Sequence, residues 1–302
     1  MYLDTTLTKS NQFFYITGGK RAEKSPDGSN YRRTKAAEEA LHFSRSRIVR
    51  VKTAALGRYS YMAGVIITLT DGRTSICSSS LLTNTRALTA AHCWATYFTQ
   101  ARFFTVVLGS TTLFSGGHRV VTADVEIHSG YSKFTLANDI AIMKLPWVTY
   151  SNNIQPIAIA TGNKDFAGTW ACAPGWGGSV TTKALLSHML VPVISNEECA
   201  DTYTTHIVRD TNICVATTGG RGPCIGDAGG PLATADNSLL IGVMSFMHDR
   251  GCDAGPVGFG RVSAYIKQEI FIKNIDSIVK ILATKHVSIQ VKLSRNRMQI
   301  YP

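Results

Sequence analysis

Short runs of β-branched and aromatic residues recur from about residue 48 onwards, separated by Gly, Asn and Ser. Many short apolar runs bounded by turn-forming residues are typical of an all-β sandwich or barrel. The pattern predicts strands within Val65–Leu69, Phe103–Leu108, His118–His128, Ile140–Leu145, Met189–Ile194 and Leu239–Phe246.

Helical patterns are few. The sequence Ser-Asn-Glu-Glu at positions 195–198 is a capping box and predicts a short helix that starts there. Apolar residues from about Ser263 to Lys285 fall mostly on one helical face and predict a longer helix. Residues 287–293 then alternate with period two, and we leave two interpretations open: an added edge strand, or a segment with no folded role.

The first 47 residues differ in composition and patterning from the rest. They are polar, rich in Lys, Arg, Ser and Asn, and show no sustained periodicity, which predicts a flexible leader or propeptide-like segment. We therefore expect three parts: the leader 1–47, a folded domain 48–272, and a helix continuation with a basic tail at 273–302.

The positive charge of the chain lies mainly in these tails. The 302 residues carry a net charge of +11, but the leader holds nine basic and five acidic residues, and residues 271–302 hold six and one. The central part is nearly balanced, so we expect no nucleic-acid partner. The longest apolar run, around residues 62–70, is too short to cross a bilayer, and we expect no membrane span.

Seven cysteines are many for a cytosolic enzyme and ordinary for a secreted one. Their spacing alone does not give the connectivity. The N-terminus shows no secretory signal, because Asp4 comes early and the apolar run 13–16 is too short for a signal core.

Three motifs carry the functional information. Thr-Ala-Ala-His-Cys ends at Cys93, Asn-Asp-Ile-Ala contains Asp139, and Gly-Asp-Ala-Gly-Gly-Pro surrounds Ala228. In this order they resemble the histidine, aspartate and serine motifs of the chymotrypsin/trypsin-like serine protease family, with Ala where the family has Ser. The resemblance covers roughly residues 48–271. Within the family, the segments 212–214 and 221–224 look most like insect midgut chymotrypsins and crustacean collagenases.

The resemblance implies a fold and a set of disulfides. The fold is all-β, with two antiparallel six-stranded Greek-key barrels, a C-terminal helix, and an active site in the cleft between the barrels. It also implies secretion. The implied disulfides leave Cys172 over, as a buried free thiol or an intermolecular partner, and they pair Cys77 with Cys93, Cys199 with Cys214, and Cys224 with Cys252.

By the same resemblance, His92 is the general base and Asp139 orients it. The backbone N–H groups of Gly226 and Ala228 form the oxyanion hole, and Ser245 supports the aspartate. Ala228 lacks the attacking oxygen, whose loss in a related triad lowers turnover by about 10⁶. No Ser, Thr or Cys between Cys224 and Leu232 offers a substitute.

The activation site also departs from the family pattern. Cleavage after Arg47 would free the Ile48 amine to pair with Asp227. Arg50 and Val51 replace the two glycines that usually follow, which removes backbone freedom from this switch. The family's Gly-Gly after the first barrel cysteine is likewise replaced, by two serines at 78–79.

The specificity pocket departs as well. Its floor is Gly222, which does not favour Lys or Arg, and its walls are Ser245, Phe246 and Met247. Met247 stands where the family usually has glycine and is expected to fill much of the cavity. If it is packed elsewhere or flexible, the pocket stays partly open. A bound peptide should then present small or apolar side chains.

These departures favour a pseudoprotease that binds peptide or protein without cleaving it, including active proteases or inhibitors as partners. We expect no cofactor and no metal. The alternative is an endopeptidase of chymotrypsin-like specificity whose serine was lost by engineering or by a sequence error. A third interpretation is a drifted copy that retains no activity.

Overall fold

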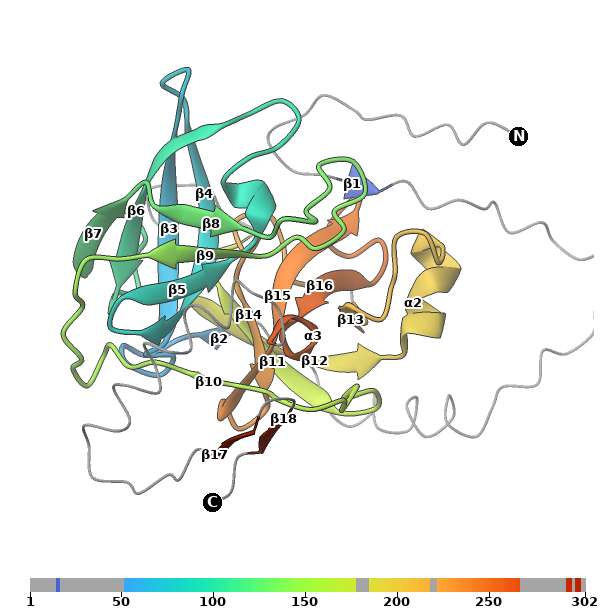
Figure 1. The fold of residues 1–302 in the computed structure, drawn as a ribbon. Helices are drawn as coiled ribbons and strands as arrows, with labels where there is room; N and C mark the ends of the chain where they lie inside the picture. The colour runs from blue at the N-terminus through green and yellow to red at the C-terminus, as the bar shows by residue number, and fades with distance from the viewer. Residues whose placement is uncertain are drawn as a thin grey trace, which may run out of the picture. The chain divides into compact units, whose positions relative to one another are not determined.

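The computed structural model describes residues 15–16, 52–177, 185–217, 222–266, 292–294 and 297–299. The chain divides into two units, Met1–Ala264 and Tyr265–Pro302, and the first contains both large sheets. Figure 1 colours the first sheet blue to green, and most of the second sheet yellow-green to orange.

The first sheet is antiparallel and has the strand order β7-β6-β3-β4-β5-β9-β8. Its two ends, β7 and β8, are separated only by Ala123 and Asp124. The Thr122 hydroxyl donates to the Lys144 carbonyl at 2.6 Å, and the Lys144 N–H donates to the Asp124 carbonyl at 2.9 Å. These bonds close the sheet into a barrel. Its strands are β3 (Met62–Leu69), β4 (Thr74–Thr83), β5 (Arg86–Thr89), β6 (Ala101–Leu108), β7 (His118–Thr122), β8 (Val125–Ile127) and β9 (Ala141–Lys144).

The second sheet closes on itself because β15 pairs with both β14 and β16 in the order β15-β14-β11-β12-β13-β16. Strand β2 adds to β12, and β10 adds in parallel to β15. The strands are β2 (Lys52–Thr53), β10 (Ala158–Ile159), β11 (Trp170–Gly175), β12 (Ser187–Ile194), β13 (Asn212–Val215), β14 (Pro231–Thr234), β15 (Leu239–His248) and β16 (Val257–Arg261).

One short strand comes from the leader. Strand β1 (Tyr15–Ile16) pairs in parallel with the end of β15, with Tyr15 opposite Met247 and Ile16 opposite His248. The sequence predicts only a flexible leader here, because two residues are too few to show a strand period. The rest of the leader lies outside the described residues.

The predicted short helix is confirmed. Helix α2 (Asn196–Tyr203) begins after Ser195, whose hydroxyl oxygen accepts the Glu198 N–H at 3.1 Å, as a capping box requires. The predicted long helix is described only at its start, as α3 (Val262–Tyr265), and residues 267–291 lie outside the described part of the chain.

The alternating segment 287–293 is described only from Lys292. There β17 (Lys292–Ser294) pairs with β18 (Arg297–Gln299) as a separate two-stranded sheet. Within the described residues, β17 pairs with β18 alone.

The barrels are filled with apolar side chains. In the first, Phe104, Leu88 and Met143 are completely buried. In the second, one cluster collects side chains from β11 to β16, among them Val191, Ile213, Leu232, Met244 and Phe259. Burial on this scale is the main force that stabilises a fold of short strands. None of the helices in the described ranges is long and apolar enough to span a membrane.

Candidate active site

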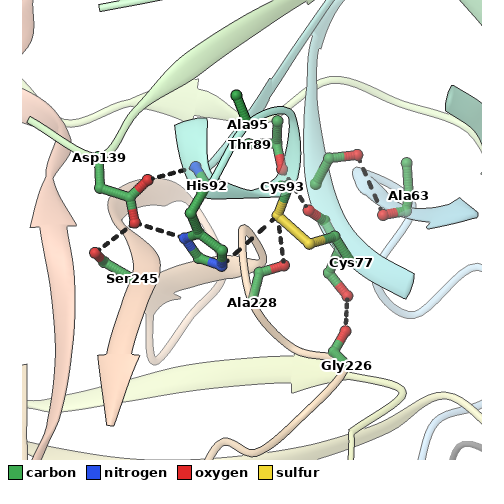
Figure 2. The surroundings of a disulfide bond; sticks show 12 residues. Ala63, Cys77, Thr89, His92, Cys93, Ala95, Asp139, Gly226, Ala228 and Ser245 are labelled. Carbon is green, nitrogen blue, oxygen red and sulfur yellow. Dashed lines mark hydrogen bonds and ion pairs between the residues drawn. A yellow bond between two sulfur atoms is a disulfide. The ribbon is translucent and has the colours of Figure 1, made fainter. Parts of the chain in front are cut away.

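The fold brings the three motifs together. His92 lies in a short 3-10 helix, η1 (Ala91–Cys93), directly after β5, and Asp139 lies in the loop before β9. Ala228 lies in the loop before β14, and Ser245 lies within β15 of the second barrel. Figure 2 shows Asp139 and Ala228 beside His92, with Ser245 bonded to Asp139. The expected combination of residues from both barrels is therefore present.

Asp139 fixes the orientation of the imidazole. His92 Nδ1 lies 2.7 Å from Asp139 Oδ2, and the His92 backbone N–H donates to Asp139 Oδ1 at 2.8 Å. The Ser245 hydroxyl donates to Oδ2 at 2.6 Å. The side chains of His92 and Asp139 are only 4% and 1% exposed. Because the carboxylate accepts the Nδ1 proton, Nε2 carries the lone pair and is the atom that can take up a proton.

The negative charge of Asp139 also affects a neighbouring tyrosine. Burial, and then the charge of Asp139, raise the pKa of Tyr131. The Tyr131 hydroxyl stays protonated and donates to the Ala95 carbonyl at 3.1 Å. This bond ties the loop before Asp139 to the segment after His92.

The other ring nitrogen has an unusual environment. His92 Nε2 lies 3.9 Å from Cys93 Sγ, and the same sulfur lies 3.8 Å from the Ala228 carbonyl oxygen. Cys93 is disulfide-bonded and its sulfur carries no hydrogen, so these are contacts rather than hydrogen bonds. Among the described residues, Nε2 has no oxygen or nitrogen partner.

The loop around Ala228 is braced from the first barrel. Ser78 of β4 donates its N–H to the Ala228 carbonyl at 2.8 Å and its hydroxyl to the Gly226 carbonyl at 2.9 Å. The Ser78 carbonyl in turn accepts the Thr89 hydroxyl at 2.9 Å. Sequence reasoning treated Ser78 only as a departure from the family glycine and missed this contact. The buried run of serines in β4 is the signal that could have pointed to it.

Two backbone N–H groups of this loop remain free. Gly226 has a φ of +95°, a conformation that favours glycine. Within the described ranges, the N–H groups of Gly226 and Ala228 donate to no protein acceptor. Alanine keeps the N–H that serine would supply, so both donors expected for the oxyanion hole are available.

Asp227 is held by two backbone N–H groups. Its Oδ1 accepts the Gly177 N–H at 2.6 Å and its Oδ2 accepts the Cys224 N–H at 2.9 Å. Burial of the carboxylate raises the pKa of Asp227 to about 6, against the lowering effect of the two N–H donors. Arg47 and Ile48 lie outside the described residues, so the predicted ion pair of the Ile48 amine with Asp227 stays a prediction.

The residues expected around the specificity pocket have different surroundings. Ser245 is bound to Asp139, and Phe246 packs edge-on against Tyr203 at 5.2 Å between ring centroids. Met247 is 4% exposed and belongs to the apolar cluster of the second barrel. A methyl group on Gly222 would come within 2.7 Å of the Cys252 carbonyl. The expected floor and wall are thus closely packed.

Six of the seven cysteines form disulfides, Cys77–Cys93, Cys199–Cys214 and Cys224–Cys252. Cys172 is free and buried, with its sulfur 3.6 Å from the Tyr59 hydroxyl. Cys77, His92 and Cys93 come close enough together to suit a metal ion. However, both of these sulfurs are in a disulfide and offer no thiolate, so this cluster is a poor metal ligand set.

The geometry agrees with comparisons to known proteins. The family model described as Trypsin matches residues 48–268. The chain belongs to the trypsin family. It is 41% identical over 224 residues to the collagenase of Hypoderma lineatum, an alignment that covers 73% of this chain and 85% of that protein. It is 36% identical over 199 residues to brachyurin of Leptuca pugilator, covering 63% and 84%.

A solved structure has the same fold. The structure titled HL collagenase at 1.7 Å resolution superposes with a TM-score of 0.69 at 39% identity, and the match covers 76% of this chain and 99% of that one. The chymotrypsin-like fold, with two barrel sheets and a short C-terminal helix, is thereby confirmed. Trypsin-family proteins act on peptides and proteins, and disulfide-rich members of this kind are typically secreted.

Proposed function

We propose that this trypsin-family protein is a secreted pseudoprotease that binds peptide or protein segments without cleaving them. The observation that carries the proposal is the methyl group of Ala228 beside an otherwise ordered His92–Asp139 pair. A methyl group cannot attack a carbonyl. The partner is an extracellular peptide or protein, including an active protease or an inhibitor.

The size of the catalytic loss supports this function. Removal of the nucleophile from a related triad lowers turnover by about 10⁶, equivalent to roughly 8–9 kcal/mol of transition-state stabilisation. What remains, roughly 10³–10⁴ over the reaction in water, comes from the oxyanion hole and from binding. This remainder is too small for useful proteolysis, and the loop from Cys224 to Leu232 contains no second nucleophile.

The retained parts of the site support binding. The brace from Ser78 holds the Gly226 and Ala228 carbonyls, so the loop is ordered without a serine. The close packing of Met247 restricts the ligand to small or apolar side chains at this position.

One observation favours the alternative, an endopeptidase inactivated by a single change. The contacts of His92, Asp139 and Ser245 are short and complete, as a working triad would need. A single engineered or erroneous Ser-to-Ala change would leave these contacts in place.

The test compares the unaltered chain with its Ala228→Ser variant on small, apolar chromogenic peptides, each before and after cleavage at Arg47. The proposal expects no turnover by the unaltered chain, together with saturable binding of the same peptides. Turnover at an ordinary enzymatic rate by the unaltered chain would contradict it. High activity in Ala228→Ser would favour the alternative, because one substitution would then have restored an intact enzyme.

A further inference from the structure

One ring nitrogen of His92, Nε2, has no oxygen or nitrogen partner among the residues that the structure describes. The residue is 5% exposed, and its Nε2 faces a disulfide sulfur rather than a hydroxyl. Buried polar groups normally find a partner because burial without one is unfavourable. The two free N–H groups of Gly226 and Ala228 lie in the adjacent loop. The two N–H groups are hydrogen-bond donors, and Nε2 becomes a third donor when His92 is protonated. An acceptor is missing for all three among the described residues.

We propose that this site binds the free C-terminal carboxylate of a peptide, the product of another protease. This inference rests on the proposed function and names its ligand class. One carboxylate oxygen accepts the N–H groups of Gly226 and Ala228. The other oxygen accepts a hydrogen bond from Nε2–H of a protonated His92. The Asp139 carboxylate, which lies at Nδ1, balances the positive charge of the ring.

The alanine is what suits the site to a carboxylate. A serine hydroxyl at position 228 would occupy the space beside Nε2 and use the nitrogen as its own hydrogen-bond partner. A methyl group makes no such bond and leaves Nε2 available. A peptide acid offers two oxygens and a charge, whereas an intact peptide bond offers one neutral carbonyl oxygen.

Charge distinguishes the two kinds of ligand. Hydrogen bonds between an imidazolium and a carboxylate are roughly twice as strong as neutral ones. Water competes little at a site where the histidine and aspartate side chains are 4% and 1% exposed. The packed Met247 and Gly222 favour a small final residue, such as alanine.

The test measures binding of two fluorescein-labelled peptides to the full chain by fluorescence anisotropy. Both have the sequence Ala-Ala-Pro-Ala, and one ends in a free carboxylate while the other ends in a carboxamide. We expect the acid to bind at least about tenfold more tightly than the amide, since a charge-assisted pair replaces a neutral one. His92→Gln should abolish this preference while the protein stays folded by circular dichroism.

Two further variants separate this role from a structural one. His118→Ala removes an exposed histidine of β7, a strand that contributes no residue to the site, and should leave the preference unchanged. Ala228→Ser should reduce the preference, because the hydroxyl competes for Nε2. An NMR signal of the His92 ring that shifts with the acid and not with the amide would place the carboxylate at this residue.

The outcomes distinguish the two proposals. Equal binding of acid and amide without cleavage would overturn the carboxylate site and leave the pseudoprotease proposal standing. Cleavage of the amide peptide by the unaltered chain would overturn the proposed function itself. No binding of either peptide would overturn the carboxylate site.

Discussion

Ser78 and Ser80 are two positions apart on β4, and both are fully buried, but only Ser78 has a partner for its hydroxyl. Ser78→Ala leaves the Gly226 carbonyl without its donor, so we expect the free energy of unfolding to fall by about 1–3 kcal/mol. Ser80→Ala removes a hydroxyl that has no partner and should leave stability unchanged or slightly raised. Urea unfolding of both variants checks this, and equal losses would contradict the brace.

At the residue scale, the sequence was sufficient to identify some residues of the site but not others. His92, Asp139 and Ala228 were identified because each lies in a motif whose neighbours are distinctive. The role of Ser78 was missed because its acceptor, the Gly226 carbonyl, is 148 positions away. A contact over such a distance leaves no periodic pattern in a single sequence.

At the scale of elements, β15 contributes both the support for Asp139 and the packing of the expected pocket. Met247→Ala should lower the free energy of unfolding by about 2–5 kcal/mol and leave a cavity. Met244→Ala is the matched control, because Met244 is buried in the same cluster on the same strand. We expect indole to raise the melting temperature of Met247→Ala alone. A similar effect of indole on both variants would contradict a pocket filled by Met247.

Strands and the capped helix were largely predictable because their signals are local. The predicted run 239–246 matches β15, and the Ser195 cap lies where the capping box placed it. The pattern predicts strand structure within the run 118–128 but not where it breaks, and the structure divides the run into β7 and β8 around Ala123 and Asp124. Its two parts pair with different neighbours, β6 and β9, and pairing partners are not encoded in the alternation itself.

For the whole molecule, Asp227 links stability to pH. Its raised pKa, about 6, means that the folded protein holds a proton between about pH 4 and pH 6 where the unfolded chain does not. The contribution of this group to the free energy of unfolding therefore falls as pH rises through that range, by up to about 3 kcal/mol. Relative to Asp227→Asn, the unaltered chain should lose stability from pH 4 to pH 7 in urea titrations.

A pH profile of Asp227→Asn that runs parallel to that of the unaltered chain would show that Asp227 does not titrate differently in the folded state.

Cys172 gives the molecule a reporter of its own opening. It is the one thiol outside the three disulfides, and burial raises its pKa. Alkylating reagents should therefore react very slowly with it while the barrel is closed. It lies in β11 between β12 and β14, at the centre of the second sheet. Labelling of this sulfur therefore requires those strands to separate. The rate of thiol modification then measures the frequency of local opening in the second barrel, and no engineered probe is needed.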